Sequence, residues 1–297
     1  MEFLQLWQLA IEAWNALGEH FEPVIEREGL EFGLEPRMWG LLLSVLTFEP
    51  EEVTPAHLMV RNPYTSADAY LRHLGEAASD GFLEEVEAGK FRLTEKGRSS
   101  TLHLAAVGRQ AMAASDPLPV SDSVELRSLL DQLAQSSINT PPPPDTWSIH
   151  LSCKLLPEVD PPMPYIEQLF SALAAYRDDA HLSAWQMTGL SATALETLTL
   201  LWRGEVNSLD TLCARLERRG HPCQVYQRVL DELHGHGLIG GTDTSLWVTG
   251  AGRVFRNQVE NDTDRFFFLP WSCLDKPSTN RLAALLEELK AGLAQED

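Results

Sequence analysis

The run Arg-Asp-Asp-Ala-His at residues 177–181 has the residue types that could bind a small molecule. On a helix, Arg177 and His181 lie four positions apart on one face, and Asp178 lies three positions before His181. A carboxylate beside an imidazole can fix its tautomer and raise its pKa. If a later helix packs back on this one, charged residues near 260–265 converge on the same face. The sequence predicts an inter-helix salt-bridge network or a ligand pocket, with a catalytic or metal site as a further alternative. The residues of the pocket would be Arg177, Asp178, His181, Asp264 and Arg265.

A second set of polar side chains could contact DNA, because glutamine and arginine make bidentate contacts to adenine and guanine. Most of this set lies in or just before a predicted helix over Pro222–His234. The corresponding helix over Ser66–Ala78 offers fewer suitable residues, and Asp68 and Glu76 would repel phosphate. Arg256 is a further candidate for a phosphate contact. The predicted DNA-contact residues are Gln224, Gln227, Arg228, Arg215, Arg218, Arg219 and Arg72.

Two stretches of the chain, residues 70–98 and 226–253, repeat one pattern. Three residue types recur 156 positions apart and three more recur 155 positions apart, so the intervening turn differs by one residue. A repeat of this kind indicates one structural module present twice. The matched pairs are Tyr70 and Tyr226, Leu74 and Leu230, Gly81 and Gly237, Thr94 and Thr249, Gly97 and Gly252, and Arg98 and Arg253.

The repeated pattern predicts a helix, a hairpin and a second helix. Tyr226, Leu230 and Leu233 form one apolar helical stripe, which a glycine ends. Leu238 and Ile239 begin a strand, the run 240–243 is expected to turn, and Thr249 is expected to cap the next helix. Two shorter helices precede each copy. The predicted fold class is therefore mainly α with small β-wings, comprising two winged helix-turn-helix domains in tandem with long packing helices.

The rest of the chain predicts the domain division. Long amphipathic helices are expected over residues 3–28 and from Pro164 onward, and a closing helix over 278–294. Residues 116–163 are expected to include a helix near Ser123–Ala134. The segment is also rich in proline, including Pro141 to Pro144, which is typical of a semi-rigid connector. We expect an N-terminal winged-helix domain at 1–115, the connector at 116–163 and a C-terminal winged-helix domain at 164–297.

The charge of the chain argues against a large DNA-binding surface. The 297 residues carry a net charge of −20, whereas nucleic-acid binders usually present a basic face. Residues 1–115 hold 18 acids and 9 bases, a net of −9, whereas residues 190–260 hold 8 acids and 7 bases, a net of −1. The second copy of the module is therefore the better candidate for a DNA contact.

Other features of the sequence limit the classes of protein to which this chain can belong. No apolar run approaches the ~20 residues of a membrane helix, and the acidic N-terminus is unlike a signal peptide. The four cysteines have no C-x-x-C spacing, which favours a cytoplasmic protein with buried thiols; redox sensing by Cys213 and Cys223 is an alternative. The sequence predicts no cofactor, metal or catalytic motif, so we expect no enzyme.

Several segments resemble a known family of regulators. The runs Leu-Thr-Glu-Lys-Gly-Arg at 93–98 and Val-Thr-Gly-Ala-Gly-Arg at 248–253 resemble the segment after the wing in multiple-antibiotic-resistance-type (MarR-like) winged-helix regulators. The segments 176–185 and 260–265, the latter followed by Pro270-Trp271, are similar to those of the SalK-like group of tandem winged-helix proteins. The resemblance covers residues 165–275 well and the N-terminal copy loosely.

The resemblance implies a DNA-binding or regulatory function. Together with the duplicated module, it favours a cytoplasmic transcriptional regulator that binds duplex DNA, and a response to a small-molecule effector is left open. MarR-like regulators dimerise, which sets two recognition helices about 34 Å apart for successive major grooves. A tandem chain would build that pseudo-dimer from one polypeptide, and a homodimer is left open. The alternative is an acidic winged-helix scaffold that binds a protein or small molecule at the domain junction and does not bind DNA.

Overall fold

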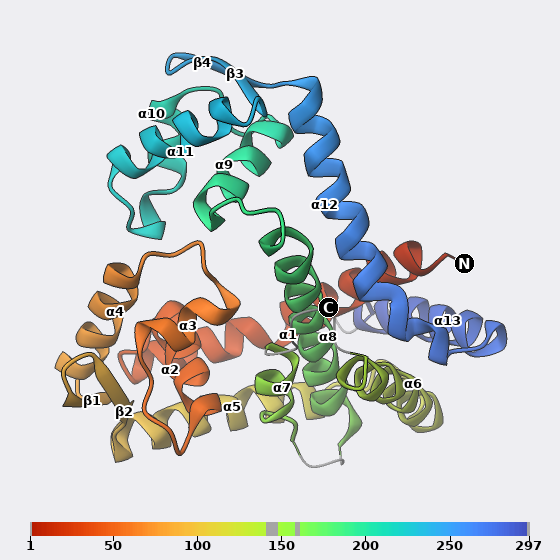
Figure 1. Ribbon diagram of the computed structural model, residues 1–297. Helices are drawn as coiled ribbons and strands as arrows, with labels where there is room; N and C mark the ends of the chain where they lie inside the picture. Colours follow the sequence, from red (N-terminus) through yellow and green to blue (C-terminus); the bar gives the residue numbers. More distant parts are fainter. Residues whose placement is uncertain (1, 141–147, 158–160, 296–297) are drawn as a thin grey trace.

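The computed structural model describes residues 2–140, 148–157 and 161–295, and it is mainly helical. One order of elements occurs twice along the chain (Figure 1). The first copy consists of α1 (Phe3–Glu31), α2 (Pro36–Phe48), α3 (Pro55–Arg61), α4 (Ala67–Ser79), β1 (Leu83–Glu87), β2 (Lys90–Leu93), α5 (Glu95–Ala114) and α6 (Val120–Ile138). The second consists of α8 (Pro162–Gln186), α9 (Ala192–Arg203), α10 (Leu209–Arg215), η1 (Glu217–Arg219), α11 (Cys223–Gly235), β3 (Ile239–Thr242), β4 (Ser245–Val248), α12 (Gly250–Phe268), η2 (Leu269–Cys273) and α13 (Lys276–Leu293). The short helix α7 (Ser148–Cys153) lies between them.

The repeated Thr-x-x-Gly motif fixes the helix after each hairpin. In the first copy, the amide of Gly97 donates to Thr94 Oγ1 at 3.0 Å, which caps α5. A Cβ atom at Gly97 would lie 1.9 Å from the carbonyl oxygen of Phe82, so only glycine allows this close approach. The second copy repeats the arrangement, with Thr249 capping α12 through the amide of Gly252 at 3.0 Å. The motif is thus explained by packing between the helix and the hairpin.

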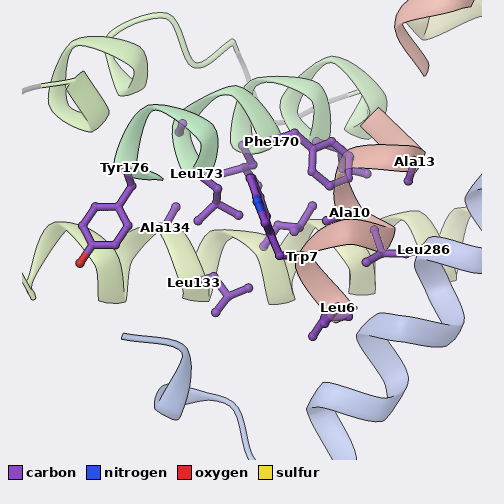
Figure 2. Close-up of a cluster of buried hydrophobic side chains, with 14 of the residues drawn as sticks. Leu6, Trp7, Ala10, Ala13, Leu133, Ala134, Phe170, Leu173, Tyr176 and Leu286 are labelled. Atoms are coloured by element: carbon purple, nitrogen blue, oxygen red, sulfur yellow. The ribbon is translucent and has the colours of Figure 1, made fainter. Parts of the chain in front are cut away.

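The two halves share their largest hydrophobic core, because each contributes a helix to the other. The helix α6 follows the first hairpin module but packs along α8 of the second half. The helix α13 follows the second hairpin module but packs along α1 of the first half. Figure 2 shows side chains from these helices meeting in one cluster, including Leu6, Trp7, Leu133, Phe170 and Leu286.

Each hairpin module also has a small core of its own. In the second module, Tyr226, Leu230 and Leu233 are buried, as the apolar stripe predicts. In the first module the equivalent Leu74 is fully buried, and Tyr70 is half-buried at the edge of the cluster. The predicted helix periodicity is therefore confirmed in both copies.

The segment predicted as a connector contains ordered helices. It includes α6, which belongs to the shared core, and α7, whose first amides donate to the carboxylate of Asp179 at 2.9 and 3.1 Å. Pro141 to Pro144, expected to form a spacer, lie outside the described residues. We keep the division at 1–115, 116–163 and 164–297 as a proposal.

The second hairpin differs from its prediction. Gly240 and Gly241, expected in the turn, lie in β3, and the chain turns after Thr242. Trp247 of β4 lies against this glycine pair, since a Cβ at Gly240 would come within 2.8 Å of the indole ring. The glycines therefore make room for a large side chain. Among the described residues, no helix is long and apolar enough to span a membrane.

Candidate functional site

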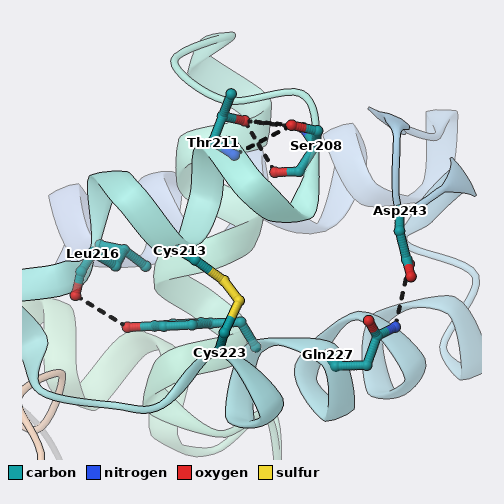
Figure 3. Close-up of a disulfide and its surroundings, with 8 residues drawn as sticks. Ser208, Thr211, Cys213, Leu216, Cys223, Gln227 and Asp243 are labelled. Atoms are coloured by element: carbon teal, nitrogen blue, oxygen red, sulfur yellow. Dashed lines mark hydrogen bonds between the residues drawn. A yellow bond between two sulfur atoms is a disulfide. The ribbon is translucent and has the colours of Figure 1, made fainter.

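The helix α11 presents a polar face to solvent. Gln224 and Arg228 are exposed on the side opposite the buried apolar stripe. Gln227 is half-buried, and its Nε2 donates to Asp243 Oδ1 of the hairpin turn at 3.2 Å (Figure 3). Two of the three predicted base-contacting side chains are thus free to reach a groove, while the third holds the hairpin against α11.

The helices α10 and α11 are joined by a disulfide between Cys213 and Cys223, whose Cα atoms are 5.6 Å apart (Figure 3). The expectation of buried thiols at these positions is therefore wrong, because folding brings the two residues within the usual bridging distance. Cys153 and Cys273 are free and half-buried. Burial raises the pKa of the Cys153 thiol to about 11, which makes it a poor nucleophile.

The predicted phosphate-contacting arginines differ in their availability. Arg218 is exposed and makes no ion pair within the described part of the chain. Arg215 is exposed and lies 3.1 Å from Glu205. Arg219 is engaged by Glu196, with its Nη2 2.6 Å from Oε1. Arg218 and Arg215 are therefore the better placed for a phosphate.

In the first module, α4 offers a weaker surface. Arg72 is exposed, but its Nε lies 4.0 Å from Glu76 Oε1 on the same helix. Asp68 is also exposed in the first turn of α4. The exposed face of α4 therefore has little net positive charge with which to attract DNA phosphates.

The turns that precede α4 and α11 are in direct contact. The backbone amide of Ser66, the N-cap of α4, donates to the carbonyl of Arg219 at 2.9 Å. The Ser66 hydroxyl donates to the carbonyl of Gly220 at 3.1 Å. We call this contact, between residues 62–66 and 219–221, the clasp.

Beside the clasp lies a cavity of about 840 Å³ between the two halves, with Tyr64 and Arg219 among the lining residues. The helices α8, α9 and α12 form one side, and Trp7, Ile11 and Tyr64 come from the first half. Six arginines and four carboxylate residues line it, which is a local excess of positive charge in a chain of net charge −20. These residues are Arg177, Arg203, Arg215, Arg218, Arg219 and Arg256, with Asp178, Glu196, Glu205 and Glu260.

The predicted cluster on α8 forms part of this cavity. Arg177 Nη2 lies 2.9 Å from Asp264 Oδ1, as the packing of α12 on α8 was expected to allow. Asp178 turns toward the first half, where its Oδ2 lies 2.9 Å from Arg61 Nε. Arg265 is not part of the cluster, because it is exposed and pairs with Asp262 at 2.8 Å.

His181 does not have the carboxylate partner that its sequence neighbours suggest. Its Nδ1 lies 3.1 Å from Thr263 Oγ1. Burial, and then the positive charge of Arg256, lower the pKa of His181 to about 4. The expectation of a raised pKa is wrong, because Asp178 faces Arg61 instead. The imidazole is neutral at pH 7 and can serve as a hydrogen-bond group of the cavity wall.

Arg256 is central to the cavity, although its sequence position suggested a phosphate contact. Only 2% of the residue is exposed. Its Nε donates to Thr199 Oγ1 at 2.8 Å, and its Nη2 lies 2.5 Å from Glu260 Oε1. Its Nη1 and the Nη1 of Arg177 are buried and have no hydrogen-bond partner among the described residues. The four-residue spacing of Arg256 and Glu260 on one helix was the only signal in the sequence for this pair.

The comparisons with known proteins bear on the second half of the chain. The model of a helix-turn-helix family matches residues 155–297, which include α8 to α13. This half carries a helix-turn-helix domain. Within the matched range, α10 and α11 are consecutive helices joined by a short turn, which is the order of elements that such a motif requires. The search of curated proteins and the search of solved structures gave no match.

Proposed function

We propose that this protein is a transcriptional regulator that binds duplex DNA through the helix-turn-helix of its second half. The family match over 155–297, together with the exposed polar face of α11, carries the proposal. The local charge agrees with it, since residues 190–260 have a net charge of only −1. The order of elements and the repeated Thr-x-x-Gly-Arg motif favour a MarR-like tandem winged-helix regulator as the finer assignment.

In this proposal α11 enters the major groove with its N-terminal end toward the bases. Gln224 and Arg228 read base edges, where a bidentate contact discriminates by ~1–3 kcal/mol. Arg218 and Arg215 contact phosphates beside the groove. The first module contributes less, because Asp68 and the ion pair of Arg72 weaken its attraction for phosphate.

The chain offers a matched pair of variants for the test. Arg228 and Arg72 occupy equivalent exposed positions on α11 and α4, 156 residues apart. We expect salt-dependent binding to a mixed-sequence duplex in fluorescence anisotropy, which Arg228→Ala weakens by about 5- to 100-fold and Arg72→Ala changes much less. Undetectable binding of the unmodified protein at low salt refutes the proposal, and equal effects of the two variants refute the assignment to the second module.

A second candidate function is the binding of a small organic anion in the cavity beside the clasp. The buried Nη1 atoms of Arg177 and Arg256 carry this candidate, because a buried donor without a partner costs free energy that a ligand oxygen would recover. The cavity volume of about 840 Å³ is in the range of small-molecule sites.

This candidate is tested by thermal shift with benzoate and phenyl phosphate as probes and benzamidine as the cationic control. We expect saturable stabilisation by the anions alone, which is lost in Arg177→Gln and in His181→Ala. Equal shifts with benzamidine, or unchanged shifts in Arg177→Gln, contradict it.

A further inference from the structure

The clasp consists of several hydrogen bonds between the two modules. Besides the two bonds of Ser66, the Nε2 of His221 lies 3.0 Å from the carbonyl oxygen of Tyr64. Arg219 Nη1 donates to Asn62 Oδ1 and to Thr65 Oγ1, each at 3.3 Å. The contact therefore involves the backbone and side chains of both turns.

Gly220 allows the two turns to approach. Its φ of +71° lies in the left-handed region, and a Cβ added there would come within 2.5 Å of the Cβ of Ala69 in the first turn of α4. A side chain at this position would therefore separate the modules. Gly204 ends α9 with a φ of +74°, and none of the described residues lies within 4 Å of a Cβ added there. The two glycines have the same conformation but differ in what surrounds them.

The clasp and Glu196 of the second module together hold Arg219 away from an external partner. Its Nε and Nη2 lie 2.9 and 2.6 Å from Glu196 Oε1, and its Nη1 is used by the first module. All three guanidinium nitrogens are thus engaged inside the protein. While the clasp is closed, Arg219 is not available to a DNA phosphate.

The closed arrangement also limits which DNA sites the two recognition helices can reach. Gly220 touches Ala69, and Gln224 follows only four residues later. At ~3.6 Å or less per residue, Gln224 lies within about 20 Å of the first turn of α4. Successive major grooves on one face of DNA are about 34 Å apart. The N-terminal ends of α4 and α11 cannot occupy successive grooves in this form, so the expected tandem spacing requires the modules to separate.

The same proximity brings negative charge near the DNA-reading end of α11. Asp68 lies in the first turn of α4 and is exposed. It therefore repels a phosphate that approaches Gln224 from the side of the first module.

We propose that the clasp is an autoinhibitory contact that keeps the protein in a closed form of low DNA affinity. This inference rests on the proposed binding of DNA by α11. Opening the clasp releases the Nη1 of Arg219 and moves Asp68 away from the reading end of α11. It also lets the second recognition helix reach a neighbouring groove. A protein that is open for only a small fraction of the time shows a DNA affinity reduced by that fraction.

The test compares Gly220→Ala with the matched control Gly204→Ala in the full chain. Two quantities are measured: the hydrogen exchange of the Ser66 amide, which the clasp alone protects through the carbonyl of Arg219, and the affinity for duplex DNA. We expect Gly220→Ala to accelerate exchange at Ser66 at least tenfold and to raise DNA affinity about tenfold. Gly204→Ala, which adds the same backbone strain without separating the modules, changes neither.

A second variant, Asn62→Ala combined with His221→Ala, removes two clasp hydrogen bonds without adding bulk. This double variant replaces Gly220→Ala in the test if Gly220→Ala does not fold. We expect it to accelerate exchange of the Ser66 amide and to raise the affinity for duplex DNA.

The outcomes separate this inference from the proposed function. Faster exchange with unchanged or weaker DNA binding overturns autoinhibition and leaves DNA binding intact. Equal exchange in all proteins shows that the clasp does not form in solution, which also overturns the inference. If no variant binds DNA, the proposed function and the inference fail together.

Discussion

The neutral imidazole of His181 makes the stability of the protein depend on pH. Its pKa is lowered from 6.5 to about 4 by burial first and then by the charge of Arg256. Below pH 6.5 the unfolded chain binds a proton at this histidine that the folded chain does not. The folded state therefore loses stability as the pH falls from 6.5 toward 4.

The size of the effect follows from the two pKa values. At pH 7 the contribution is close to zero, and at pH 5 the lowered pKa of His181 costs about 2 kcal/mol of unfolding free energy. Other groups near the cavity oppose this trend, because burial raises the pKa values of Asp178 and Glu196. The difference between the unmodified protein and His181→Gln isolates the histidine.

Urea denaturation at pH 7 and pH 5 measures this difference. We expect the unmodified protein to lose about 2 kcal/mol more than His181→Gln over this interval. His236→Gln, at an exposed position, serves as the control and is expected to behave like the unmodified protein. If all three proteins respond equally to pH, the burial of a neutral imidazole at residue 181 is refuted.

Two further predictions concern the helix-turn-helix half. Gly252→Ala should lower the free energy of unfolding by about 1–3 kcal/mol, because its Cβ would lie 2.0 Å from the carbonyl of Leu238. Gly250→Ala should leave the free energy of unfolding equal or higher, since a Cβ there meets no described residue within 4 Å. Equal stabilities of the two variants in urea denaturation would contradict the packing argument. Reduction by dithiothreitol should lower the stability by about 2–3 kcal/mol, because the disulfide closes a short loop between Cys213 and Cys223. The double serine variant should already be at the lower stability and be insensitive to reductant, so a dithiothreitol effect of equal size in both proteins would rule out the disulfide as its cause.

The sequence predicted the local structure of both modules because the signals for it are local. The apolar stripe of Tyr226, Leu230 and Leu233, the capping Thr249 and the repeated Gly252 each constrain residues within one or two turns. These features are periodic or depend on the conformation of a single residue, so they can be identified from one amino-acid sequence. The fold class, mainly α with small β-hairpins, followed from them.

The arrangement of the modules could not be predicted, because it depends on contacts between residues far apart in the chain. The hydrogen bond from the Ser66 amide to the Arg219 carbonyl joins residues separated by more than 150 positions. It is made by backbone atoms, so the two side-chain types give no sign of it in the sequence. The packing of α6 on α8, and of α13 on α1, also could not be predicted. The spacing of apolar residues shows which face of a helix is buried, but it does not show which other helix covers that face. The cavity was only partly anticipated: the positions of Arg177 and His181 suggested it, whereas Arg256 was assigned to the surface.

The exchange of helices between the halves has a consequence for biosynthesis. The N-terminal helix α1 packs along α13, whose residues 276–293 leave the ribosome long after α1 has emerged. Until then the nascent chain carries an aromatic stripe, including Phe3 and Trp7, whose partners Phe267 and Trp271 have not been made. The shared core can therefore close only after residues 276–293 have been synthesised, and until then the apolar segments of the growing chain are exposed to aggregation.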